Sequence, residues 1–203
     1  MADDTRYAYA VARVRGLETR LLDHQWIERL LGESAEGAVK VLSDSAYQAA
    51  FADVERPEDI ESGLERAMAE TLDVLAAIAP EPELIDVFRI RWDVRNAKAL
   101  LKASLLGVEN EGLGVVDGIG TLELGDMRSA IADRDYAMLP EYLTEALRDA
   151  EQAYRDRGEL VAIDEVLDRA LWERTLSVAR QSSSAVLVGS FPAKFVRSNL
   201  RTF

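Results

Sequence analysis

Apolar residues recur at intervals of three and four along the chain, the spacing that places them on one face of a helix. The clearest such face carries Leu64, Met68, Leu72, Leu75 and Ile78. Pro57 suits the first turn of that helix, and Pro80 ends it. In the first half of the chain we predict helices over residues 5–31, 36–42, 45–51, 57–79 and 82–106.

Helical spacing continues in the second half, where the strict apolar/polar alternation of a half-buried strand is scarce. The helices predicted there cover residues 122–132, 140–156, 163–181 and about 184 to the end. The pattern therefore predicts an all-α protein.

A glycine-rich stretch interrupts this succession of helices. Residues 107–120 contain Gly107, Gly112, Gly114, Gly118 and Gly120. Such clusters of glycine mark connections between elements. We predict a first helical unit over residues 1–106, a linker over 107–120 and a second, incomplete unit over 121–203.

A short pattern is common to both predicted units. Residues 91–100 align without gaps to residues 194–203, sharing a basic and an aromatic residue, then an asparagine and a second basic residue. The two asparagines are Asn96 and Asn199. We interpret the match as the trace of a duplicated helical unit.

Composition narrows the classes of function. The 203 residues include 24 Lys and Arg against 37 Asp and Glu, and a net charge of −13 repels the phosphates of nucleic acid. Without cysteine and with His24 as its one histidine, the chain cannot build a disulfide framework or a three-histidine zinc site. The sequence has no secretory leader and no membrane-spanning run, so we expect a cytoplasmic protein.

Sequence patterns typical of catalysis are missing. The glycines between Gly112 and Gly120 fit neither a dinucleotide-binding nor a phosphate-binding loop. Neither the Gly-x-Ser-x-Gly elbow of hydrolases nor the Glu-x-x-His pairing of di-iron bundles occurs. We predict no catalytic residue, no cofactor and no metal, with a carboxylate-bound metal inside a helical bundle as the disfavoured alternative.

An asparagine interrupts the apolar face of the helix over 82–106. Asn96 continues a row of residues four apart, which consists of Leu84, Phe88, Trp92, Asn96 and Leu100. Burying an amide is costly unless its donors and acceptor are satisfied. We therefore expect Asn96 to bond a group on a neighbouring helix and fix how the two pack, and a ligand contact is the alternative.

The same helix carries a row of basic residues. Arg91, Arg95, Lys98 and Lys102 are spaced four, three and four apart. One interpretation pairs them with acidic neighbours, such as Glu61, Glu65 and Glu70, or leaves them in solvent. The sharper interpretation is a docking surface for an acidic partner.

Several stretches together resemble one family, the C subunit of V-type ATP synthases, which corresponds to the d subunit of vacuolar ATPases. Residues 7–22, Tyr7-Ala-Tyr9-Ala-Val-Ala-Arg13-Val-Arg15-Gly-Leu17-Glu18 with Leu21-Leu22, are similar to its first helix. Residues 88–103 resemble its aromatic-Asp-x-x-Asn-x-Lys helix, with Trp92, Asp93, Asn96 and Lys98 at the motif positions. Matches continue in order at Ile119–Leu122, Leu139-Pro140, Ile163-Asp164 and Leu167–Ala170.

The resemblance implies a non-catalytic rotor subunit, peripheral to the membrane. The family is all-helical, with three related units forming a socket that seats the central shaft of the ATPase head on the proteolipid ring. Ion transport by the ring, of protons or sodium, is thereby coupled to ATP synthesis or hydrolysis. A helical scaffold that docks on an acidic partner through the basic helix face is the alternative function.

This chain departs from the family pattern in two ways. We expect these 203 residues to hold only two of the family's three units, and the second copy of the motif, which includes Asn199, has Val196 where the first has Asp93. Residues 184–203 carry several large apolar side chains. We expect this last segment to double back on residues 140–181 or to pair with a second copy of the chain.

Overall fold

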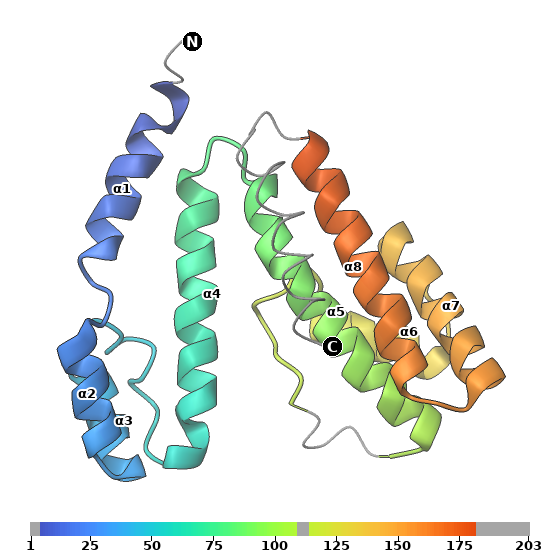
Figure 1. Ribbon diagram of the computed structural model, residues 1–203, viewed down its shortest axis with the longest axis horizontal. Coiled ribbons are helices and arrows are strands. Elements are labelled where there is room, and N and C mark those ends of the chain that lie inside the picture. The colour runs from blue at the N-terminus through green and yellow to red at the C-terminus, as the bar shows by residue number, and fades with distance from the viewer. Residues whose placement is uncertain (1–4, 109–113, 182–203) are drawn as a thin grey trace. The chain divides into compact units, whose positions relative to one another are not determined.

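A computed structural model describes residues 5–108 and 114–181, and within them every regular element is helical. The prediction of an all-α fold is therefore confirmed. The elements are η1 (Thr5–Tyr7), α1 (Ala8–Glu18), α2 (His24–Gly32), α3 (Ala35–Ser43), η2 (Pro57–Asp59), α4 (Ile60–Ile78), α5 (Glu83–Leu106), α6 (Leu124–Asp133), α7 (Glu141–Arg157) and α8 (Val161–Gln181), where η marks a 3₁₀ helix (Figure 1).

Two predicted helices near the N-terminus are interrupted by side chains that bond the backbone. The stretch over 5–31 divides into α1 and α2 because Asp23 caps α2, accepting from the Trp26 N–H at 3.1 Å. The segment 45–51 forms turns instead of a helix, with the Ser45 hydroxyl bonded to both Leu42 O and Tyr47 N. The helix predicted from about residue 184 lies outside the described residues.

Contacts divide the chain into two compact units, residues 1–85 and 86–203. This division lies earlier than the boundary predicted at 107–120, because nearly all of α5 packs within the second unit. The core of the first unit gathers around Phe51, with Val39 and Leu42 from α3 and Ala67 from α4. Gly63 lets the ring approach α4, since a Cβ there would lie 2.8 Å from Phe51 Cε1.

The second unit has the larger core, formed by all four of its described α-helices. Its most deeply buried large residues are Leu100 and Leu101 of α5, Met127 of α6, Leu143 and Leu147 of α7, and Ile163 and Leu167 of α8. Helices α7 and α8 pack along each other (Figure 1). None of the helices in the described ranges is both long and apolar enough to cross a membrane.

The buried face of α5 is rotated from the predicted row. Ile90, Val94, Ala97 and Leu101 are buried at intervals of four, three and four, whereas Phe88 is 41% exposed. The predicted row therefore runs along the edge of the interface and enters the core only at Asn96 and Leu100.

Candidate functional site

Asn96 holds a connecting segment against α5. Its Nδ2 donates to the Val116 carbonyl at 2.6 Å, and the Val116 N–H donates to Asn96 Oδ1 at 2.9 Å. The side chain is buried, at 3% residue exposure, so these bonds satisfy groups that water cannot reach. We expected a partner on a neighbouring helix, but the partner is the backbone of the segment between α5 and α6.

Asp93 holds the same segment a few residues further along. Its carboxylate accepts from the backbone N–H of Thr121 and Leu122, at 3.0 to 3.1 Å, and from Thr121 Oγ1 at 2.6 Å. The Thr121 N–H lies within bonding distance of both oxygens, so these three donors make four contacts and engage both oxygens of the carboxylate. Gly120 permits the approach, since a Cβ there would overlap Asp93 Oδ1.

We call Asp93, Asn96 and residues 116–122 the clasp. Asp93 and Asn96 are three residues apart and therefore lie on the same face of α5. Between their attachment points Ile119 is fully buried, and its carbonyl accepts from Arg89 Nη1 at 3.3 Å. This part of the predicted linker is thus packed into the second unit.

Within the clasp, burial is the main influence on the pKa of Asp93. It raises the pKa of the Asp93 carboxyl above its usual value of 3.8, while the bonds from Thr121 and Leu122 act in the opposite direction. The negative charge of Asp86 adds to the rise in pKa.

Two of the four predicted docking residues are bound to α8. Lys102 Nζ lies 2.7 Å from both carboxylate oxygens of Asp164, and Lys98 Nζ lies 2.6 Å from Asp168 Oδ1 and 3.8 Å from Asp164 Oδ1. These two lysines thus find internal acidic partners, but on α8 and not among the suggested glutamates of α4. Lys98 and Lys102 join α5 to α8.

The remaining basic residues of the row lie closer to solvent. Arg95 is exposed, places its guanidinium 5.2 Å from the centre of the half-buried Trp92 ring and donates to the Gly114 carbonyl at 3.1 Å. Arg91 is exposed and makes no hydrogen bond or ion pair within residues 5–108 and 114–181. Of the predicted docking surface, Arg91 and Arg95 therefore stay available, and Asn199 lies outside the described residues.

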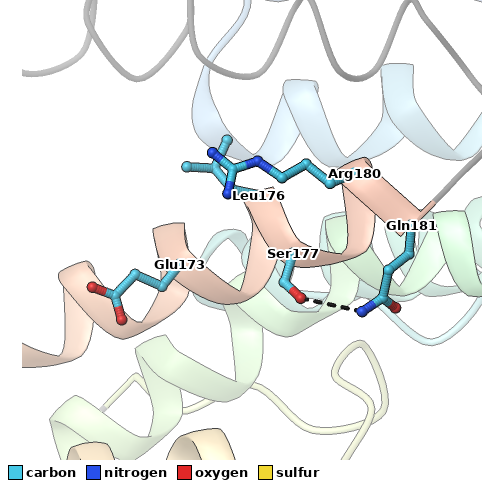
Figure 2. Close-up of a pocket in the computed structure, with 5 residues that line it drawn as sticks. All are labelled: Glu173, Leu176, Ser177, Arg180 and Gln181. Atoms are coloured by element: carbon cyan, nitrogen blue, oxygen red, sulfur yellow. Dashed lines mark hydrogen bonds between the residues drawn. The ribbon is translucent and has the colours of Figure 1, made fainter.

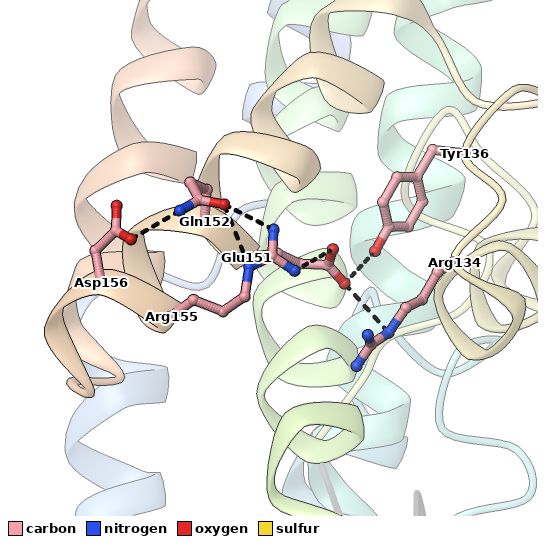
Figure 3. A network of polar contacts seen from close by, with 6 residues as sticks. All are labelled: Arg134, Tyr136, Glu151, Gln152, Arg155 and Asp156. Carbon is pink, nitrogen blue, oxygen red and sulfur yellow. Dashed lines mark hydrogen bonds and ion pairs between the residues drawn. The ribbon is translucent and has the colours of Figure 1, made fainter.

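A polar network that joins α7 to the segment after α6 was not predicted from the sequence. The hydroxyl of the buried Tyr136 donates to Glu151 Oε1 at 2.9 Å (Figure 3). Arg134 and Arg155 lie 3.6 and 3.9 Å from the same carboxylate. Burial and the Glu151 bond together raise the pKa of Tyr136 well above its ordinary range. The sequence could have indicated this network through the position of Glu151, which lies four residues after the buried Leu147 and so on the apolar face of α7.

The described side chains form no cluster of three or more His, Asp or Glu residues that could hold a metal ion. The polar groups of the clasp bond to each other and to the backbone, an arrangement that organises structure. The structure thus shows α5 bonded to the connecting segment and to α8, with a basic, aromatic surface beside it.

Comparison with known proteins gives consistent matches. Residues 10–191 match the model of a family described as the ATP synthase (C/AC39) subunit. The C subunit of a V-type sodium ATPase from Enterococcus hirae is 25% identical over 190 residues, which cover 93% of this chain and 57% of that protein. The C subunit of an A-type ATP synthase from Methanothermobacter thermautotrophicus is 32% identical, covering 96% and 53% respectively. The chain thus spans about half the length of these curated relatives.

Proposed function

Because the chain belongs to the ATP synthase (C/AC39) subunit family, we propose that it is a non-catalytic subunit of the central stalk of a V/A-type rotary ATPase. The observation that carries this proposal is the family match from residue 10 to residue 191, which includes the complete clasp. The family resemblance inferred from the motif residues of α5 is confirmed by that match.

The proposed role is mechanical. A subunit that seats the shaft on the proteolipid ring must transmit torque without deforming, and several features of the second unit support stiffness. Helix α5 has 24 residues, about 36 Å at 1.5 Å per residue. The clasp attaches the connecting segment to it, and Lys98 and Lys102 attach it to α8.

The finer architecture is part of the proposal. Two sequence-related units, over 1–106 and 121–203 with 107–120 between them, would supply part of a socket that three such units complete. The subunit would lie at the cytoplasmic face of the membrane, bound through the proteolipid ring, and would need no cofactor or metal of its own. Either protons or sodium could be the transported ion.

Coupling between the ATPase head and the ring tests the role. Membrane vesicles from cells in which the gene is deleted should lose ATP-driven ion uptake, while the ATPase head keeps hydrolysing ATP, because its catalytic sites lie on other subunits. Expression of the chain from a plasmid should restore ion uptake. Unchanged ion uptake in the deletion strain would refute the proposal.

A further inference from the structure

A hollow of about 340 Å³ lies between α5 and α8 in the second unit. Among the described residues, its charged lining is Arg91, Arg95 and Lys98 from α5 and Asp168 from α8. Three cations thus face one carboxylate, giving this small region a charge of about +2 in a chain whose net charge is −13. A concave site of this sign favours an anionic ligand.

The three cations differ in how many hydrogen bonds and ion pairs they already make within the protein. Lys98 is bound to Asp168 at 2.6 Å and is mostly buried, so these two charges balance each other and the net positive charge comes from the two arginines. Arg95 donates one hydrogen bond, to Gly114 O, and within the described residues its other guanidinium donors make none. Arg91 makes no bond within the same residues. The guanidinium groups of both arginines therefore have N–H donors available for a carboxylate, whose two oxygens can each accept from one of them.

The remaining lining is apolar and includes Trp92 and Leu171. Arg95 lies over the Trp92 ring, which orients its guanidinium and limits the entropy lost on binding. A ligand that places an aliphatic stem or neighbour on this wall and a carboxylate on the arginines matches both surfaces.

A second hollow in this unit has no such charge preference. It has a volume of about 440 Å³ along one face of α8, and the described residues that line it include one acid and one base, Glu173 and Arg180 (Figure 2). The larger hollow thus provides a neutral comparison for the smaller one.

We propose that the hollow beside Trp92 binds a glutamate or aspartate side chain from an acidic, partly apolar segment of a partner protein. A nucleic acid is disfavoured because the net charge of −13 repels an extended phosphate chain. Residues 182–203 contain no Asp or Glu, so their side chains cannot supply the anion. The inference rests on the geometry of the second unit and holds whether or not the chain works in a rotary ATPase.

Nuclear magnetic resonance of the full chain tests it, with the peptide acetyl-Gly-Leu-Glu-Glu-Leu-Gly-amide as probe and the same peptide with both Glu replaced by Gln as control. Trp26 is a matched internal reference, because it is also half-buried and has an arginine three residues on, Arg29, at 5.6 Å. We expect the acidic peptide to shift the Trp92 indole resonance saturably and to leave that of Trp26 unchanged. The Gln peptide should shift neither.

Variants decide which groups bind. R91Q/R95Q should weaken binding of the acidic peptide about tenfold, since it removes both guanidinium charges and their charge-assisted hydrogen bonds at a site that solvent partly screens. R29Q should leave binding unchanged. Equal shifts of both tryptophans, or equal binding by R91Q/R95Q, would overturn the proposal. Binding seen only in E109Q/E111Q would overturn it as well, because the chain's own Glu109 and Glu111 would then occupy the hollow.

Discussion

At the scale of single residues, Asn96 is a position where one substitution should be costly. N96L leaves the Val116 N–H and carbonyl buried without partners, so we expect the free energy of unfolding to fall by about 1–3 kcal/mol despite the better helix propensity of leucine. Urea denaturation measures the change. S104L, at an exposed position of the same helix, should change stability by less than about 0.5 kcal/mol. Equal effects of the two substitutions would contradict a packing role for the amide.

Gly120 should be sensitive for a steric reason. In G120A the new methyl group must displace Asp93 from its donors, and we expect a loss of about 1–3 kcal/mol. Gly125 has no atom within 4 Å of its would-be Cβ and lies in α6, so G125A should instead stabilise by about 0.5–1 kcal/mol. In a D93A background most of the cost of G120A should disappear. An undiminished cost would show that the glycine serves another purpose.

The titration of Asp93 predicts how stability depends on pH. Because its folded-state pKa is raised, the folded chain binds a proton that the unfolded chain has released. This group therefore lowers the free energy of unfolding as the pH rises from about 4, the unfolded pKa, to the higher folded pKa. D93N cannot titrate, so the stability of the natural chain minus that of D93N should fall over this range.

Urea denaturation of both proteins between pH 4 and pH 7 gives that difference. A difference that rises with pH would mean that the bonds from Thr121 and Leu122 outweigh burial, and that the folded pKa is lowered.

A buried polar residue can be recognised in a sequence more easily than its partner. The apolar neighbours of Asn96 predict that it is buried and bonded, because an unsatisfied amide is costly. They do not identify Val116, twenty residues away, because any backbone segment can offer the same N–H and carbonyl. Asp93 and Glu151 carry charges that ordinarily lie in solvent, so their burial depends on contacts that only the fold defines.

At the scale of elements, the ion pairs that Lys98 and Lys102 make with two aspartates of α8 should stabilise the packing of α5 on α8. Lys102 and Asp164 are only partly exposed and make two short contacts, so K102Q should lower the free energy of unfolding by about 1 kcal/mol. R15Q removes an exposed pair with Glu18 and should cost less than about 0.5 kcal/mol. In a D164N background, K102Q should have little further effect, and an unchanged cost there would contradict the pairing.

Helices bounded by proline were predictable, whereas a break that depends on a single local bond was not. Helices α4 and α5 follow from apolar spacing and from Pro57, Pro80 and Pro82. The break before α2 depends on one cap at Asp23, and the turns after α3 on the hydroxyl of Ser45. Such single local bonds compete with helix formation without altering the hydrophobic pattern.

At the scale of the whole molecule, the glycines of 107–120 suggested a boundary that the contacts place earlier. Glycines mark a turn or a loop, but they do not show whether that loop packs against the core. Here the bonds of the clasp hold residues 116–122 against α5, within the second unit. The basic row illustrates the same limit, since the sequence does not specify that Asp164 and Asp168 of α8 would take two of its four members. Family membership was predictable because motif residues along most of the chain match in order.

Affinity purification of the chain, tagged at its N-terminus in its own cells and extracted from membranes with mild detergent, tests the central claim most directly. The proposed role predicts that the shaft subunits and the proteolipid of a V/A-type ATPase co-purify with the chain in a fixed ratio, as quantified by mass spectrometry. A tagged cytoplasmic protein of similar size serves as the control for non-specific capture. Recovery of the chain without shaft or proteolipid, from cells whose ATPase is intact, would contradict the account.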